Sequence, residues 1–563
     1  MNNQEYLSSL NRRAIVEKLS IEEFDILVIG GGITGAGIAL DAATRGLRVA
    51  LIEKHDFASG TSSRSTKLIH GGLRYLKQFE IALVREVGQE RDIVFHNAPH
   101  LVIPEKMLLP IIKGGSLSSF SASIGLYMYD WLAGVVRSER RKMLSGKVTL
   151  QTEPLLNKDI VTGGALYTEY RSDDARLVIE TVKKAVEFGA VCLNYIEAKK
   201  LLYNNQGKVM GTYAADLNSG GTFEIKAKKV INAAGPWVDE IRELDKSRKG
   251  KRLHLTKGIH IVVDHARLPI HHATYFDVAD GRMIFAIPRA GTTYIGTTDT
   301  NYKGNKENPA VTKTDVDYVL AATNAMFPEA KLTVDDVQST WSGLRPLIHE
   351  DGKNPSELSR KDEIFISASG LVSIAGGKLT GYRQMARKSV DVVLKQMKED
   401  NNRPFVSCKT EKMTLSGGEF KNRDEIFKYI EKCAGEAKQI GGTYQDVANL
   451  VWKYGSNTAE IIEKAYEMRE NNRTTGAIQP ENLLWQAEVW YGINKELVLN
   501  LGDFLIRRTG MLYFERPKIA QRIAFYKQQF ALLLNWDSLE LQHQVDYFNN
   551  EYNAVVDFID EEK

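Results

Sequence analysis

A glycine-rich turn near the N-terminus constrains the fold of this chain more than any other feature. Residues 25–29 form a short apolar run, typical of a strand that is buried on both faces. Gly30, Gly32 and Gly35 follow with the spacing G-x-G-x-x-G, and an alanine-rich stretch that predicts a helix comes next. The first glycine permits a tight turn, the second lets a pyrophosphate approach the backbone, and the third lets the helix pack closely on the strand.

A second predicted strand, residues 48–53, ends at Glu53, where a carboxylate can accept hydrogen bonds from a ribose. Strand, turn, helix and glutamate together favour a dinucleotide site over a tight turn that binds no ligand. The charge of Glu53 disfavours NADP because it would repel the 2′-phosphate. FAD and NAD both remain candidate cofactors. The position near the N-terminus favours FAD, and so does a later Gly376-Gly377 turn before a predicted helix, whose N-terminus could face a flavin ring.

The composition is that of an ordinary globular protein. Its 563 residues predict about two to four domains at ~150 residues each. Hydrophobic residues make up 43% and charged residues 26% of the chain, which excludes a disordered or fibrous protein. The net charge of +3 argues against a dedicated nucleic-acid binder. Cys192, Cys408 and Cys433 are widely separated, so we expect no disulfide framework, no metal site and a reducing compartment.

We expect no targeting sequence and no membrane-spanning segment. Residues 1–20 are polar and charged and lack the apolar region of a secretory signal. The longest uncharged stretches lie between Asp25 and Asp41 and between Lys113 and Asp130, and both are short for a span and rich in Gly or Ser. The sequence therefore predicts a cytoplasmic protein that is soluble or at most attached to a membrane surface.

The pattern of apolar residues changes along the chain. Residues 161–250 have α/β character, residues 251–345 are rich in predicted strands, and residues 420–563 alternate apolar and charged positions at helical spacing. We therefore expect an α/β FAD-binding Rossmann-like domain with a β-rich substrate domain, plus an all-α C-terminal domain. The expected bounds are 21–105, 161–250 and 341–398 for the FAD-binding domain, 106–160 and 251–340 for the substrate-binding domain, and 412–563 for the helical domain.

Several motifs together identify a family. Residues 59–76 read SGTSSRSTKLIHGGLRYL, residues 30–37 read GGGITGAG, and residues 376–383 read GGKLTGYR. Shorter matches are DDARL (173–177), NAAGPW (232–237), KGIHIVV (257–263), IGTTDT (295–300), GLRPL (343–347) and FLIRRT (504–509). With these motifs the chain resembles, over nearly its whole length, the FAD-dependent glycerol-3-phosphate dehydrogenases of the glycine-oxidase-like flavoprotein superfamily. It departs from the family at Gly381, where a threonine is usual.

The resemblance implies an enzyme that oxidises sn-glycerol 3-phosphate to dihydroxyacetone phosphate. Hydride would pass from C2 to flavin N5, and the electrons would pass to a membrane quinone. An alternative is a glycerophosphate oxidase that reduces oxygen, although such enzymes usually carry an insert that is absent from this sequence. An amino-acid oxidase of the same superfamily and a non-catalytic flavin-binding protein are further alternatives, which the basic residues of the expected site disfavour.

The resemblance also assigns residues to the substrate. Arg345 and Lys378 are expected to bind the phosphate, because arginine offers a bidentate fork and lysine a point charge. Arg74 is the third basic group expected there, and Tyr75 is a candidate hydrogen-bond donor. His260 is the leading candidate for the base, with Arg345 and Arg74 as groups that assist catalysis electrostatically. His70 is the second candidate base, or a residue that lines the flavin.

A larger set of residues is expected to bind FAD. Most lie in the glycine-rich turn, at the end of the second strand, in the Ser/Thr-rich segment and around the Gly-Gly turn. The set is Gly30, Gly32, Ile33, Thr34, Gly35, Glu53, Lys54, Thr61, Ser62, Ser63, Thr66, Lys67, Leu68, His70, Gly71, Ala198, Ala234, Gly235, Gly377, Lys378, Leu379 and Thr380.

Two expectations concern partners. Members of this family are peripheral membrane enzymes, and residues 114–142 pair aromatic side chains with a basic run that suits the anionic inner face of the cell membrane. The other interpretation of this segment is a core helix with a solvated basic loop. Arg507 and Arg508 in the C-terminal domain are expected to be structural and to pair with the first domain. A homodimer formed through the C-terminal domain is compatible with the sequence.

Overall fold

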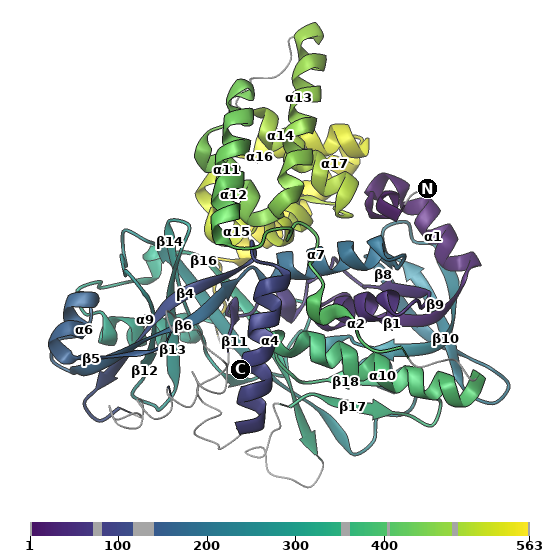
Figure 1. Cartoon of the computed structure of the whole chain (residues 1–563), viewed down its shortest axis with the longest axis horizontal. Coiled ribbons are helices and arrows are strands. Elements are labelled where there is room, and N and C mark those ends of the chain that lie inside the picture. The colour runs from purple at the N-terminus through teal and green to yellow at the C-terminus, as the bar shows by residue number, and fades with distance from the viewer. Residues whose placement is uncertain are drawn as a thin grey trace.

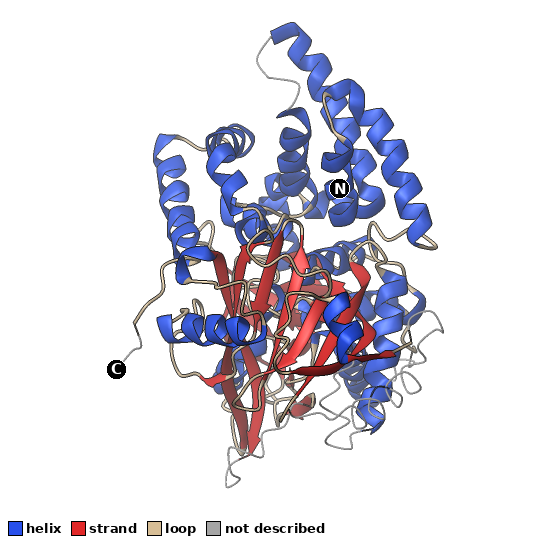
Figure 2. Ribbon diagram, turned by 90° about the vertical axis from the view of Figure 1, so that its left-hand side faces the viewer, coloured by secondary structure: helices blue, strands red, loops and turns tan. Residues whose placement is uncertain are grey.

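The computed structural model describes residues 3–70, 81–115, 126, 140–350, 361–401, 406–475 and 482–560. Its described part contains two β-sheets and a group of C-terminal helices (Figure 1). In that view the first sheet lies on the right, the second lies on the left, and the C-terminal helices lie above them. Figure 2, turned by 90°, shows the strands gathered below these helices.

The first sheet contains the predicted βαβ unit at its centre. Its strands are β1 (Glu23–Ile29), β2 (Val49–Ile52), β7 (Val191–Leu193), β8 (Ile196–Tyr203), β9 (Val209–Asp216), β10 (Thr222–Asn232), β17 (Glu363–Ile366) and β18 (Val372–Ala375). The order is β17-β18-β10-β1-β2-β7, and β9 and β8 extend it from β10 as an antiparallel pair. From β18 to β7 the neighbours are parallel, and β1 is buried from Phe24 to Ile29. This burial on both faces explains the apolar run of residues 26–29, while the buried Asp25 of the same strand pairs with Lys228.

The second sheet is largely antiparallel. Its strands are β3 (Leu68–Ile69), β4 (Val102–Ile112), β5 (Lys142–Ser145), β6 (Val161–Ser172), β11 (Lys251–Asp264), β12 (Ala273–Asp277), β13 (Met283–Arg289), β14 (Thr292–Gly296), β15 (Thr300–Asn301) and β16 (Val337–Glu350). The order is β15-β11-β14-β13-β12-β4-β6-β3, with β16 paired along β11 and β5 along β6. The long β11–β16 pair brings residues that are far apart in the sequence, such as Lys251 and Glu350, directly opposite one another.

Helices cover both sheets. In chain order, those before the C-terminal group are α1 (Arg12–Ile21), α2 (Ile33–Thr44), α4 (Ile81–Asn97), α6 (Gly146–Thr152), α7 (Asp174–Glu187), α8 (Val238–Leu244), α9 (Lys313–Met326) and α10 (Tyr382–Asn401). Helix α2 follows β1 and packs against both α7 and α10. Every residue of α2 from Gly35 to Thr44 is buried, which accounts for its alanine-rich sequence.

The C-terminal region is helical, as the sequence predicts. Its helices are α11 (Arg423–Ala437), α12 (Tyr444–Tyr454), α13 (Thr458–Thr475), α14 (Leu483–Lys495), the π-helical segment Asp503–Arg508, α15 (Met511–Phe514), α16 (Arg516–Leu534) and α17 (Ser538–Ala554). Helices α11 to α14 share one apolar core. A second core joins α14 to α17 to the second sheet through residues such as Trp341 and Tyr294.

The expected domain bounds differ from the sheets at β3, at the start of β4, at β6 and at β16. We expected residues 161–250 and 341–398 in the FAD-binding domain, but β6 and most of β16 pair within the second sheet. Both strands are long, and each finds its partner, β4 or β11, far away in the sequence. The division into three domains stays a prediction, with these strands moved to the second sheet.

Within the described part of the chain, no helix combines the length and the apolar character needed to cross a bilayer.

Candidate active site

A first cavity of about 600 Å³ opens at the carboxyl ends of β1, β2 and β10. This is the edge at which open α/β sheets bind their ligands, and the volume is ample for a small-molecule site. Residues that line it come from the glycine-rich turn, the end of β2, the start of β8, the turn after β10 and the turn before α10. The predicted residues among them are Gly30, Gly32, Ile33, Thr34, Glu53, Lys54, Thr61, Ser62, Ala198, Ala234, Gly235, Gly377, Lys378 and Leu379.

Close backbone packing explains the glycines of the turn. Gly30 has φ +113°, and a Cβ there would lie 2.5 Å from the carbonyl oxygen of Ala233. A Cβ on Gly35 would overlap the carbonyl oxygen of Gly30, so the third glycine lets α2 approach β1 and does not itself line the cavity. Helix α2 then begins at Ile33, whose N–H donates to Ser62 Oγ over 3.0 Å. The helix N-terminus therefore faces the cavity, as phosphate binding requires.

Glu53 lies at the end of β2, where the sequence places it. Its Oε2 accepts from the N–H of Gly31 over 2.6 Å and its Oε1 accepts from the N–H of His55 over 2.9 Å. Burial raises the pKa of Glu53, while these two N–H groups lower it. The carboxylate is thus fixed to the glycine-rich turn with lone pairs left for a ribose. Neighbouring Lys54 also lines the cavity and forms an ion pair with Glu307 at 2.7 Å.

Small residues form another part of the cavity lining. Ala198 comes from β8, and Ala234 and Gly235 follow β10. A Cβ on Gly235 would have no atom within 4 Å, so the space above this residue is open. A glycine-rich turn, a helix N-terminus, a fixed carboxylate and an unobstructed alanine-glycine turn are the groups that FAD needs for its diphosphate and ribose. The residues present therefore fit FAD.

A second cavity, of about 300 Å³, adjoins the first. The two share Thr61, Ser65, Pro346, Gly377, Lys378 and Leu379. The second cavity lies against the second sheet and is lined by predicted residues from both the flavin and the substrate groups. These are Thr61, Thr66, Leu68, His70, His260, Arg345, Gly377, Lys378, Leu379 and Thr380.

Arg345 reaches the second cavity from β16. Its Nη2 donates to Thr297 Oγ1 over 3.0 Å and its Nη1 donates to the carbonyl oxygen of Thr298 over 3.2 Å. Its Nη1 also lies 3.4 Å from the carboxylate of Asp299. Side chains at Gly258 would collide with the guanidinium, which explains the glycine on the neighbouring strand β11. Arg345 is therefore oriented by its neighbours before any ligand arrives.

His260 lies on β11, opposite Trp341 of β16. Its ring stacks on the indole with 4.8 Å between centroids, and its Nε2 lies 3.1 Å from Thr66 Oγ1. Among the described residues, no partner reaches its buried Nδ1. Burial lowers the pKa of His260 well below its ordinary value, and the charges of Arg345 and Lys67 lower it further. The imidazole is therefore neutral near pH 7 and able to accept a proton.

His70 lines the second cavity beside Lys378. Burial lowers its pKa to about 3, and the charges of Lys378 and Arg91 add to this effect. Its ring meets Phe285 edge-on, with 6.1 Å between centroids. Both candidate bases are thus neutral, but they lie beside different cations. His260 lies near Arg345, and His70 lies near Lys378.

Not every predicted residue faces a cavity. Ser63 and Lys67 line neither of the two. Lys67 instead turns into the protein, where its Nζ donates to the carbonyl oxygen of Ser63 over 2.8 Å and to Asp174 Oδ1 over 2.6 Å. The buried Asp174 thus holds the ammonium of Lys67, and the expected contacts of Ser63 and Lys67 with FAD stay predictions. Gly71, Arg74 and Tyr75 lie outside the described residues.

The second cavity also contains residues that the sequence did not indicate. Arg64 and Arg282 add two cations, and Tyr275 and Phe285 stack at 4.1 Å to form an aromatic side. Arg282 lies on no recognised motif, so no signal was available for it. Thr297, Thr298 and Asp299 belong to the IGTTDT motif, and that motif could have placed them beside Arg345.

Comparisons with known proteins agree with this geometry. A family described as "FAD dependent oxidoreductase" matches residues 25–383, and one described as "C-terminal domain of alpha-glycerophosphate oxidase" matches residues 408–540. The aerobic glycerol-3-phosphate dehydrogenase of Bacillus subtilis (strain 168) is 51% identical over 515 residues, 92% of each chain. That of Staphylococcus haemolyticus is 49% identical over 552 residues, 98% of this chain and 97% of the other.

A solved structure extends the comparison to three dimensions. The X-ray structure of the glycerol-3-phosphate dehydrogenase from Bacillus halodurans complexed with FAD matches with a TM-score of 0.84 at 43% identity, over 99% of this chain and 100% of the other. Fold and first cavity together define an FAD-dependent oxidoreductase, whose cofactor is FAD. The chain belongs to the aerobic glycerol-3-phosphate dehydrogenase family. The resemblance, the fold class and the cofactor predicted from the sequence are confirmed.

Proposed function

We propose that this chain oxidises sn-glycerol 3-phosphate to dihydroxyacetone phosphate in the second cavity. The observation that carries the proposal is that Arg345 and Lys378 both line this cavity, and that Lys378 and the adjoining Gly377 and Leu379 also line the FAD cavity. A phosphate bound by the two cations would place a three-carbon alcohol beside the boundary between the cavities. Arginine and lysine together suit a dianionic phosphate better than a single carboxylate.

The residues of the second cavity divide the work of the reaction. Arg345, already oriented by Thr297 and Thr298, holds the phosphate with its fork. His260 accepts the proton of the C2 hydroxyl. Burial lowers the pKa of His260 most, and the charges of Arg345 and Lys67 lower it further. A bound phosphate dianion offsets the effect of these charges, so substrate binding makes this histidine a better base. When bound, FAD supplies the hydride acceptor at N5.

We further propose that the electrons leave to a membrane quinone at the inner face of the cell membrane. Support for this step comes from the family resemblance and from the aromatic and basic composition of residues 114–142. Most of that segment lies outside the described residues. The alternative acceptor is oxygen, since the matching C-terminal family is described as that of alpha-glycerophosphate oxidase. A homodimer stays a prediction.

An anaerobic titration tests the proposed substrate. We expect sn-glycerol 3-phosphate to bleach the visible flavin band of the purified protein promptly, and the sn-glycerol 1-phosphate enantiomer to leave it unchanged. A yellow protein that bleaches with an amino acid but not with the phosphate ester would contradict the proposal. Repeating the reaction in air separates the acceptors, because an oxidase would form peroxide in proportion to turnover and a quinone-dependent dehydrogenase would need added quinone.

A further inference from the structure

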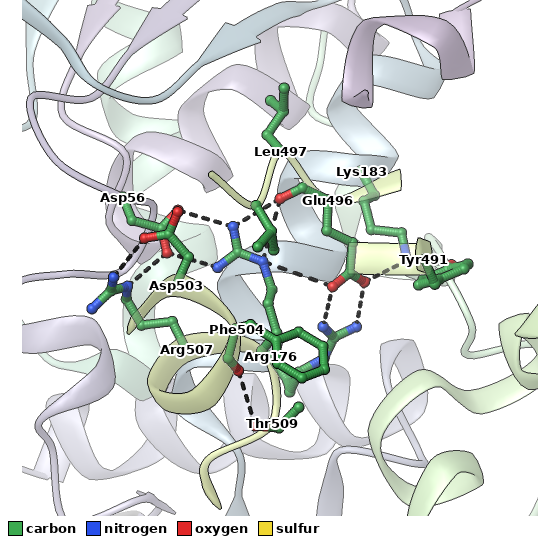
Figure 3. A network of polar contacts seen from close by, with 12 residues as sticks. Asp56, Arg176, Lys183, Tyr491, Glu496, Leu497, Asp503, Phe504, Arg507 and Thr509 are labelled. Carbon is green, nitrogen blue, oxygen red and sulfur yellow. Dashed lines mark hydrogen bonds and ion pairs between the residues drawn. The ribbon is translucent and has the colours of Figure 1, made fainter. Parts of the chain in front are cut away.

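The C-terminal helices contact the FAD-binding region through a buried carboxylate, Asp56. Its side chain is inaccessible to solvent, and both oxygens are occupied (Figure 3). Arg508 donates from Nη1 over 2.8 Å and from Nη2 over 2.9 Å, and Arg507 donates from Nε over 2.6 Å. Asn194 adds a bond of 2.9 Å from its amide. Two arginines some 450 positions away in the sequence thus hold one aspartate, as expected for structural pairing with the first domain.

Asp56 belongs to a turn that forms part of the FAD cavity. We call residues 53–58 the ribose turn. Glu53, Lys54 and His55 of this turn line the first cavity, and Asp56 does not. The far end of the turn supports the glycine-rich turn, because the N–H of Ala58 donates to the carbonyl oxygen of Gly31 over 3.1 Å. The position of Asp56 therefore affects both parts of the dinucleotide site.

The arginines are themselves fixed. Arg508 also donates to the carbonyl oxygen of Glu496 over 2.8 Å, and Arg507 donates to Asp503 Oδ1 over 2.7 Å. Burial raises the pKa of Asp56, but the charges of Arg508 and Arg507 outweigh it and lower the pKa to about 2. The aspartate is consequently ionised near pH 7. A buried pair of this kind strongly restrains the backbone that carries it, since an unpaired partner would be costly.

We propose that Arg507 and Arg508 are positioning residues for FAD. Through Asp56 they hold the ribose turn in place and thereby fix the Glu53 carboxylate at the ribose of the cofactor. The C-terminal domain is then a functional part of the FAD site, although none of its residues lines the first cavity within the described part of the chain. This inference depends on FAD as the cofactor and is independent of the substrate proposed above.

A nearby ion pair provides a matched control. Arg176 of α7 donates to Glu496 from Nη1 over 2.7 Å and from Nη2 over 2.8 Å. Its side chain is 1% exposed and joins the same C-terminal segment to the FAD-binding region. Arg176 lines neither cavity and binds Glu180 and Glu496 instead of the ribose turn. Loss of this fork should weaken the attachment of the domain without moving Glu53.

The test compares Arg508→Lys with Arg176→Lys in the purified holoenzyme. Flavin fluorescence rises when FAD leaves the protein, so dilution gives its dissociation constant and release rate. We expect Arg508→Lys to weaken FAD binding by about tenfold or more and excess FAD to restore its activity. Both variants should lower the melting temperature by similar amounts. In Arg176→Lys, however, FAD binding should stay within about twofold of the wild type.

Equal changes in FAD affinity for the two variants would overturn the proposal, since the arginines would then act only through general stability. Unchanged FAD affinity in Arg508→Lys would overturn it as well. If Arg508→Lys does not yield folded protein, Arg507→Lys replaces it, because this variant leaves the Arg508 fork on Asp56 intact. There we expect FAD to bind about three- to tenfold more weakly, and wild-type affinity would contradict the proposal.

Discussion

The two cavities are built in different ways. Backbone groups form much of the first cavity, and they come from a glycine-rich turn, a helix N-terminus and an alanine-glycine turn. Side chains form the second, and they come from strands whose pairing brings distant residues together. On β11 and β16, Thr256 lies opposite Arg345 and His260 lies opposite Trp341. The first cavity is therefore sensitive to added atoms, whereas the second is sensitive to removed ones.

Gly35→Ala should have the largest effect, because it adds an atom where two backbone segments touch. The new Cβ would overlap the carbonyl oxygen of Gly30, and neither backbone can rotate away as a side chain could. Helix α2 must then move off β1, so we expect a protein that is isolated without FAD or does not fold. The measurement is the ratio of flavin to protein absorbance. Gly435→Ala is the control, since a Cβ on this glycine of α11 meets no atom within 4 Å and should leave the ratio unchanged. A yellow, fully loaded Gly35→Ala protein would contradict the close packing.

His260→Gln should have the next largest effect, and it should act on turnover. Removing a general base costs typically about 10²-fold or more in kcat, while FAD should stay bound because His260 does not line the first cavity. Steady-state kinetics with an artificial acceptor gives kcat directly. The control is His265→Gln, just beyond β11, whose ring lies 3.1 Å from Thr293 Oγ1 and outside both cavities. A rate near that of the wild type would remove His260 from the mechanism and leave His70 as the base.

The contrast between the cavities also explains what the sequence could predict. The backbone-built cavity leaves a local signature, because its three glycines stand at a fixed spacing in one βαβ unit. Gly35 packs against Gly30 of the same unit, whereas Gly30 packs against Ala233 after β10. The register of β11 against β16 has no such signature, so Arg345 and His260 could be assigned to one site only through the family resemblance. The sequence also does not indicate which way a side chain points. Lys67 follows a Ser/Thr-rich segment that borders both cavities, yet the buried carboxylate of Asp174 draws it inward.

The same limit applies to whole strands. Strands β6 and β16 have apolar patterns that fit either sheet, and only their long-range partners β4 and β11 decide between them. Arg282 lies just before β13 and in no motif, and nothing in its sequence context distinguishes it from a surface arginine. The fold class and the helical C-terminal region could be predicted because they depend on local periodicity, whereas domain bounds and cavity membership depend on tertiary pairing.

Arg345→Ala should affect substrate affinity more than turnover. The fork provides charge-assisted hydrogen bonds to a phosphate, so its loss should raise KM by about 10- to 100-fold, and Arg345→Lys should recover part of it. FAD should remain bound. Arg267→Ala is the control, because this exposed arginine pairs with Asp336 and lines neither cavity. Loss of FAD with an unchanged KM would place Arg345 at the cofactor instead of the phosphate.

The smallest expected effect is on the pH dependence of kcat/KM. This profile shows whether His260 or the substrate phosphate titrates. Burial, Arg345 and Lys67 keep the pKa of His260 well below its ordinary value, so this histidine is neutral in the free enzyme near pH 7. A phosphate ester loses its second charge below a pKa of about 6, and a monoanion binds Arg345 less strongly. We therefore expect kcat/KM to fall on the acid side with an apparent pKa near that of the substrate. The same decline should persist in His260→Gln at a lower overall rate. If His260→Gln abolished the decline, the histidine itself would titrate there, and the charges around it would not be controlling its protonation.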